Sequence, residues 1–412
     1  MTSVYVVLAY IVMIAMQFTM TIPIIDTVNI GGYTLRYLLY YLFIYTTPFF
    51  ALFSASAKRV FLSKRFFYAF FFIAFSLISS ISAPGSFVQK TAEAAMFLVP
   101  VALCCVAENS TCGRKVCMNW LLAVNIVAGV VSFLVATKII EVNIWAAEGS
   151  LVRTAGAING TLGVGGSIAA LVLMFVDEDN GQKKKVSRTL FEIGGFLGSA
   201  LVVLFSLSRT RIVLLLAMCA VVFVYNLIIK GTIKGNFKLL ILLIVSAVFV
   251  FKAFPEITKL LVDSIQGRYN MGVTDENVDF RVIEMQKQLE MFKESPILGK
   301  GWGIRTETYI TSNQMFIHNI FTSLLMHTGI VGTVLYLLWY LNYFIELIKM
   351  YAIKNFKKEA LIGILFLISL TILGVTNSGL TQSGAYFMMF YTAILVRDYE
   401  SERMPAAEEH TI

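Results

Sequence analysis

The chain is dominated by apolar runs that are long enough to cross a lipid bilayer. Stretches of about 20 mainly apolar residues, the length a helix needs to span the hydrocarbon core, recur along its 412 residues. Apolar residues make up 58% of the chain and charged residues 14%, against roughly 45–50% and about 25% in soluble domains. The mean hydropathy is +0.78. The sequence therefore predicts an all-α, polytopic membrane helix bundle.

The apolar runs divide the chain into membrane spans and loops. Hydropathy predicts about twelve transmembrane helices. The first run, Val4–Met20, lacks a basic start and a small-residue cleavage site, so we expect a retained helix rather than a signal peptide. The predicted spans are residues 4–20, 34–54, 66–82, 91–107, 118–137, 159–176, 190–207, 212–229, 239–254, 317–345, 360–376 and 383–396.

Basic residues collect in alternate loops between these spans. Because Lys and Arg favour cytoplasmic loops, this pattern predicts a multi-pass membrane protein with both termini in the cytoplasm. Orientation also explains the net charge of +8, so we expect no nucleic-acid partner. The basic loops hold Lys58, Arg59, Lys64 and Arg65, then Arg114 and Lys115, then Lys183, Lys184, Lys185 and Arg188, then Lys230, Lys234 and Lys238, and finally Lys349, Lys354, Lys357 and Lys358.

One long polar segment interrupts this pattern and defines the expected organisation of the chain. Residues 255–316 carry both charge signs and should form a large loop on the outer face. Nine spans precede it in residues 1–254, and three follow in residues 317–397. Residues 398–412 form a short polar tail on the cytoplasmic side.

Part of the outer loop should be helical. In Asp279–Glu294 apolar residues recur at helical spacing, while Arg281, Glu284 and Gln288 share another face. We expect an amphipathic helix that lies on the bilayer or over a cavity. The run from Gly299 to Gly303 lacks the strand and helix of a dinucleotide motif, so we expect a loop whose glycines allow close approach.

Arginines are the main candidates for binding an anionic substrate on the outer face. Arg209 and Arg211 lie in a tight connection between two spans, where two neighbouring cations repel unless an anion lies between them. Guanidinium groups bind phosphate through two parallel hydrogen bonds. Arg153 and Arg281 are further candidates. The alternatives are that Arg153 only reaches the lipid headgroups and that Arg281 pairs with Glu284.

A histidine at the mouth of an apolar helix is the candidate base. His318 opens the span at 317–345, and a histidine can take or give a proton near neutral pH. An interfacial histidine with a purely structural role is the alternative. On a straight helix His327 points to nearly the opposite side, so we expect no metal pair and a mild effect of replacing it. Cys112 and Cys117 lack the additional ligands of a zinc site, and we expect no cofactor.

The same residues resemble the motifs of the O-antigen ligase and Wzy-type polymerase superfamily. His318-Asn319-x9-Gly329-x-x-Gly332 resembles its H[NSQ]-x9-GxxG signature, and Ser208-Arg209 resembles its SR element. Arg281, followed by Ser295-Pro-Ile-Leu-Gly-Lys-Gly301, resembles its outer-loop stretch. Arg153-Thr-Ala-Gly156 resembles its RxxG element, although the Pro-Asn that often follows is Thr161-Leu162 here.

This resemblance implies a metal-independent glycosyltransferase of the GT-C type. It would transfer a glycan from undecaprenyl diphosphate to a sugar hydroxyl on the outer leaflet. His318, Arg281 and Arg209 would act in catalysis, and Arg211, Arg153 and Asn319 would bind the pyrophosphate or the glycan.

We favour a polymerase of lipid-linked repeat units. Its expected partners are a chain-length regulator and a flippase of the same pathway. The alternatives are a ligase that uses lipid A-core as acceptor and a transporter or flippase. A transporter places ionisable groups near the membrane midplane, whereas this sequence gathers them outside.

Overall fold

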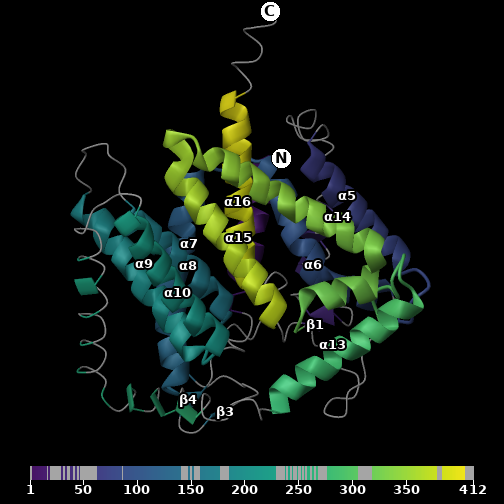
Figure 1. Cartoon of the computed structure of the whole chain (residues 1–412), viewed down its shortest axis with the longest axis horizontal. Helices are drawn as coiled ribbons and strands as arrows, with labels where there is room; N and C mark the ends of the chain where they lie inside the picture. Colours follow the sequence, from purple (N-terminus) through teal and green to yellow (C-terminus); the bar gives the residue numbers. More distant parts are fainter. Residues whose placement is uncertain are drawn as a thin grey trace, which may run out of the picture.

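The computed structural model shows a helical bundle (Figure 1). It describes much of the chain, and the statements below concern those residues. The described residues are 2–15, 17–18, 29–30, 33–34, 63–85, 87–140, 147–148, 151–152, 158–176, 185–228, 276–304, 318–377 and 383–403, with isolated residues between 38 and 46 and between 237 and 267.

Long helices account for most of the described residues. Two short antiparallel ladders join β1 (Asn29–Ile30) to β2 (Tyr33–Thr34) and β3 (Ala147–Glu148) to β4 (Leu151–Val152). Short 3-10 turns occupy Lys354–Phe356 and Ser383–Ala385. The helices are α1 (Thr2–Ala15), α5 (Lys64–Ser79), α6 (Phe87–Glu108), α7 (Arg114–Ala136), α8 (Gly160–Phe175), α9 (Val186–Phe205), α10 (Arg209–Ile228), α13 (Glu276–Glu294), α14 (Ile320–Tyr351), α15 (Lys357–Asn377) and α16 (Tyr386–Arg403).

The helices coincide with the predicted spans wherever these fall on described residues. Among those residues five helices are long and apolar enough to cross a membrane. They are Arg114–Ala136, Val186–Phe205, Arg209–Ile228, Ile320–Tyr351 and Lys354–Thr376. Three apolar helices are shorter: Val4–Ile14, Phe97–Glu108 and Gly160–Phe175. The predicted spans 34–54 and 239–254 lie largely outside the described residues, so the count of twelve remains a prediction.

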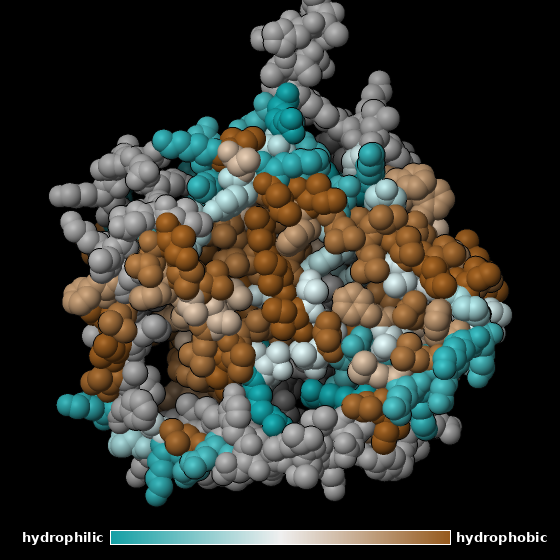
Figure 2. Space-filling model, in the orientation of Figure 1, coloured by the Kyte–Doolittle hydropathy of each residue, from teal (hydrophilic) through white to brown (hydrophobic). Residues whose placement is uncertain are grey.

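The surface has the pattern expected of a protein that crosses a membrane. Figure 2 shows a broad hydrophobic belt with hydrophilic residues above and below it. Large apolar side chains of α7, α10 and α14 are exposed in the absence of lipid, among them Val127, Leu216 and Leu341. Their exposure is consistent with contact to acyl chains, because lipid replaces water around such side chains.

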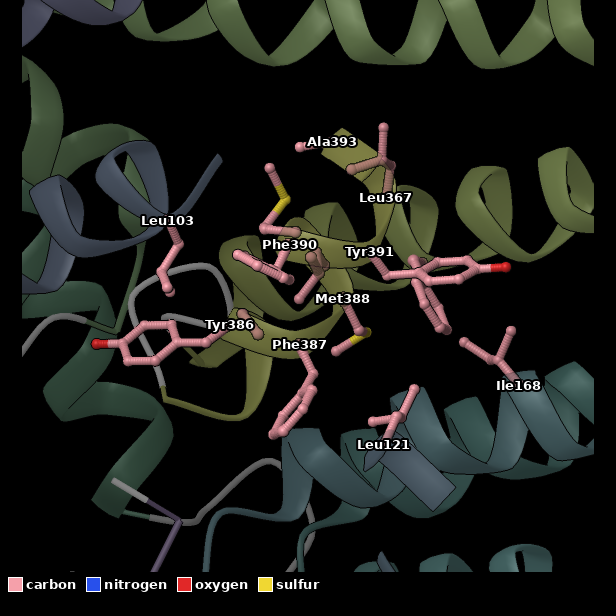
Figure 3. Packing of buried hydrophobic residues seen from close by; sticks show 14 of the residues in the cluster. Leu103, Leu121, Ile168, Leu367, Tyr386, Phe387, Met388, Phe390, Tyr391 and Ala393 are labelled. Carbon is pink, nitrogen blue, oxygen red and sulfur yellow. The ribbon is translucent and has the colours of Figure 1, made fainter. Parts of the chain in front are cut away.

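Helix α16 is the centre of the hydrophobic core. Every side chain from Tyr386 to Val396 is buried. Figure 3 shows Phe387, Met388 and Tyr391 among residues of α6, α7, α8 and α15. A helix that is apolar on all sides is buried by its neighbours, so α16 holds the helices of the bundle together.

Small residues allow α7, α8 and α9 to pack closely. A Cβ atom added to Gly129 of α7 would lie 2.5 Å from the Cα atom of Gly198 in α9. One added to Gly166 of α8 would lie 2.2 Å from the Ser199 hydroxyl oxygen. Such small-residue contacts bring helix backbones together where no hydrophobic effect drives association.

We call the upper end in Figure 1, where α5 begins and α16 ends, the basic end. Arg65 at the start of α5 donates to Glu108 at 2.7 Å and to Glu400 at 2.7 Å. Arg397 of α16 donates to the carbonyl oxygens of Ala107 and Cys112. These bonds join α5, α6 and α16, so charges from segments far apart in the sequence share this end.

Candidate active site

The end of the bundle opposite the basic end is formed in part by α13. The helix predicted at Asp279–Glu294 is confirmed and begins three residues earlier, at Glu276. Its polar face points inward: Glu284 and Gln288 are buried, whereas Val282 and Leu289 on the apolar face are exposed. This orientation brings the polar face against the beginning of α14.

The most distinctive contact of this end is an imidazole–carboxylate pair. His318 Nδ1 lies 2.5 Å from Glu284 Oε2. The His318 side chain is 20% exposed and that of Glu284 is 1% exposed, so the imidazole is accessible while its carboxylate partner is enclosed. The ring of Phe280 meets the imidazole edge-on, with ring centroids 5.6 Å apart.

The carboxylate is held by a short chain of hydrogen bonds. The amide of Gln288 donates to Glu284 Oε1 at 3.1 Å. The Thr322 hydroxyl in turn donates to Gln288 Oε1 at 2.5 Å. Thr322 therefore holds Gln288, Gln288 engages Oε1 of Glu284, and His318 lies against Oε2, so both carboxylate oxygens have a partner.

Two more predicted site residues tie α13 and α14 to the last turn of α15. Asn319 caps α14, because its side-chain oxygen accepts from the backbone N–H groups of Phe321 and Thr322. Its amide nitrogen donates to the Val375 carbonyl at 3.3 Å. Arg281 Nη1 donates to the Thr376 carbonyl at 3.2 Å. The structure thus brings His318, Asn319 and Arg281 together at one place.

Helix α14 is interrupted, which corrects the straight helix expected from the sequence. His318 lies before the cap, and Gly329 breaks the helix with φ 60° and ψ −165°. The backbone N–H groups of Lys300 and Gly301 bond to the carbonyls of Met326 and His327. The N–H of Ile330 bonds to the Pro296 carbonyl at 2.8 Å. The loop between α13 and α14 thereby satisfies the backbone groups that the interruption leaves open.

The glycines of this loop make the close approach that the sequence predicts. Gly299, Gly301 and Gly303 all have positive φ angles. A Cβ atom on Gly299 would lie 2.5 Å from the His327 carbonyl oxygen, and one on Gly301 would lie 2.6 Å from the Ser79 carbonyl oxygen. The loop therefore binds both α14 and the end of α5 through backbone contacts.

His327 has a structural environment that differs from that of His318. It is fully buried, and its Nδ1 lies 2.9 Å from the Gly301 carbonyl oxygen. Its ring stacks on Trp302. His327 lies in the regular first part of α14, before the interruption at Gly329, whereas His318 lies before the helix begins, so helical spacing alone does not relate the two histidines.

Arg209 and Arg211 lie at the start of α10, beside the start of α8. Arg211 is buried, and Arg209 is half-buried. A Cβ atom on Gly160 would lie 2.8 Å from Arg211 Cδ and 2.9 Å from its Nη1, so the arginine lies directly against the first residue of α8. Asn159 caps α8 by accepting from the N–H of Thr161 at 2.9 Å. Two helix N-termini, which favour negative charge, thus lie beside these guanidinium groups.

The remaining predicted features divide between described and undescribed residues. Arg153 lies outside the described residues, so its predicted role is untested. No group of three or more His, Cys, Asp or Glu side chains that could hold a metal ion occurs among the described residues. The sequence interpretation placed Glu284 beside Arg281 as a possible ion partner and missed its contact with His318. Its place on a polar stripe with Gln288 was the available signal.

Comparison with known proteins identifies the central part of the chain. Residues 194–337 match the family model described as O-antigen ligase. The family resemblance is confirmed. The matched region contains Arg209, Arg211, Arg281 and His318, and it leaves out Arg153. No curated protein matches the chain. The chain thus combines apolar, membrane-length helices with a histidine–carboxylate pair inside the region that matches this family model.

Proposed function

We propose that this protein is a membrane glycosyltransferase that polymerises undecaprenyl-diphosphate-linked oligosaccharide repeat units on the outer leaflet. The observation that carries the proposal is the contact between His318 and Glu284 within the region that matches the O-antigen ligase family. A histidine with a buried carboxylate partner is suited to accept a proton from a hydroxyl group. The reaction class is transfer of a glycosyl group to a sugar hydroxyl.

The proposed reaction starts with the acceptor hydroxyl at His318. The imidazole takes the hydroxyl proton as the oxygen attacks the anomeric carbon of the donor. The bond between that carbon and the diphosphate oxygen breaks, and its electron pair leaves with the lipid diphosphate. His318 then returns the proton to solvent or to the leaving group.

The leaving diphosphate requires positive charge, which the arginines supply in this proposal. Arg209 and Arg211 lie where α8 and α10 begin, and helix N-termini add partial positive charge there. Arg281 lies beside His318, on the helix that carries Glu284. We assign Arg209 and Arg211 to the diphosphate, and Arg281 to the developing negative charge at the reacting bond.

A ligase is the second candidate, because the matched family model carries the description O-antigen ligase. The chemistry at the donor is the same in both, and only the acceptor differs. A polymerase extends one lipid-linked unit with another, whereas a ligase uses lipid A-core. Purified protein with donor alone therefore separates them: a ladder of longer lipid-linked glycans supports the polymerase, and product only after lipid A-core is added supports the ligase.

Replacing His318 tests the proposed reaction directly. In reconstituted protein His318→Ala should lower the rate by about 10²–10⁴, the usual worth of general-base help. His410→Ala, in the polar tail, is the matched control and should retain full activity. Because arginines supply the positive charge in this proposal, EDTA should leave activity unchanged. Full activity of His318→Ala, or EDTA inhibition that a divalent ion reverses, would contradict the mechanism.

A further inference from the structure

Glu284 is an acidic side chain that the structure places against the proposed base, and no motif of the sequence pointed to it. Its side chain is 1% exposed although it belongs to a helix of the outer loop. Burying a carboxylate is costly unless hydrogen bonds satisfy both oxygens. Here His318 lies within hydrogen-bond distance of Oε2, and Gln288 donates to Oε1. The site therefore retains a buried acid that is fully engaged.

The direction of the hydrogen bonds determines which imidazole nitrogen carries the hydrogen. The Thr322 hydroxyl donates to the Gln288 side-chain oxygen, and this leaves the Gln288 NH₂ group to donate to Glu284. A carboxylate oxygen only accepts. With Glu284 as the carboxylate, the donor across the 2.5 Å separation from its Oε2 is His318 Nδ1. In the neutral ring the other nitrogen, Nε2, then holds the lone pair.

We propose that Glu284 is a positioning residue that holds His318 in the tautomer with hydrogen on Nδ1, so that Nε2 is the atom that takes the acceptor proton. The inference rests on the proposed function and deepens it. As the hydroxyl proton moves to Nε2, the imidazole becomes a cation. The adjacent carboxylate stabilises that cation and itself stays unprotonated. Gln288 and Thr322 prevent the carboxylate from turning away.

Two substitutions of Glu284 distinguish a role in positioning His318 from a purely structural role, because the two roles predict opposite orders of activity. Glu284→Gln keeps the length of the side chain and one acceptor oxygen, but it loses the charge and the second acceptor. Glu284→Asp keeps the charge on a shorter side chain. A structural role predicts that Gln is tolerated better than Asp. A role in stabilising the imidazolium predicts the reverse, because only the charged side chain stabilises the cation.

The kinetic test uses reconstituted protein and lipid-linked oligosaccharide extracted from cells that lack this protein. Glu284→Gln should lower kcat by at least about 10-fold with an unchanged KM for the lipid-linked substrate, and Glu284→Asp should retain more activity than Gln. Glu290→Gln, an exposed acid on the same helix, is the control and should match the wild type. The proposal is overturned if Glu284→Gln has the wild-type kcat, or if its kcat is higher than that of Glu284→Asp.

A measurement on the unaltered protein keeps the proposal testable if the variants fold poorly. The chain has three histidines, so ¹⁵N-histidine spectra can be assigned with His318→Gln and His410→Asn. The neutral ring of His318 should show hydrogen on Nδ1, and hydrogen on Nε2 overturns the proposal. If His318→Ala were fully active while the Nδ1 tautomer is found, the proposed function fails and the positioning contact stands.

Discussion

The imidazole of His327 stacks on the indole of Trp302, with ring centroids 4.2 Å apart and 20° between the ring planes. Both side chains are fully buried. Trp302 belongs to the loop between α13 and α14, and its backbone N–H donates at 2.9 Å to the hydroxyl of Ser80, which follows the end of α5. The stack therefore fastens the loop to two helices beside the interruption in α14.

His327→Ala should destabilise the protein even though we assign His327 no part in the chemistry. The substitution removes the aromatic stack, the hydrogen bond to Gly301 and the volume of a buried ring. Together these are worth about 2–4 kcal/mol. Melting in detergent measures the loss. His327→Phe keeps the stack and should fall between alanine and the wild type, and equal melting temperatures for all three would contradict this assignment.

The contacts of His327 also show where sequence reasoning about α14 stops. The expectation of a mild effect on activity used a straight helix and included neither the break at Gly329 nor the loop that packs against it. Helical periodicity predicts on which face of a helix a residue lies. It does not predict the break, which depends on contacts with a loop distant in sequence. Nor does it predict which group a buried polar side chain contacts.

The parts that the sequence did predict are those set by local pattern. The apolar runs predicted the helices, and the polar stripe of Arg281, Glu284 and Gln288 predicted one face of α13. Family motifs predicted that His318, Asn319 and Arg281 belong to one site, and the structure brings them together. The contact between Glu284 and His318 joins α13 to the residue before α14, 34 positions along the chain, so no local pattern could specify it.

Gly329→Ala should disrupt the fold of the outer loop. At φ 60° and ψ −165° the backbone lies in a region that only glycine readily adopts. An added Cβ would also lie 2.3 Å from the Ile297 carbonyl oxygen. Gly194→Ala in α9 is the control, because its Cβ would make an ordinary 3.4 Å contact with Ile126. Loss of folded protein, measured by size-exclusion chromatography, is expected for Gly329→Ala alone.

Activity should depend on the shape of the arginine side chains at the start of α10 as well as on their charge. Arg209→Lys keeps the charge but loses the planar fork that binds phosphate, so activity should fall. Arg209→Ala and Arg211→Ala should lose more, at normal membrane levels of the protein. Lys354→Ala, at the basic end, is the control. Full-length polymer from both alanine variants on glycan gels would show that these arginines only support the bundle.

Exposure to impermeant reagents should separate the two ends of the molecule. In a background without the five native cysteines, Glu290→Cys on α13 should react with a membrane-impermeant thiol reagent in intact cells, or in spheroplasts where an outer membrane is present. Ser401→Cys, exposed near the end of α16, should react only after permeabilisation. This result is expected because basic residues gather at the α16 end and favour the cytoplasm. The reverse pattern would place His318 on the cytoplasmic side, where a reaction on the outer leaflet could not occur.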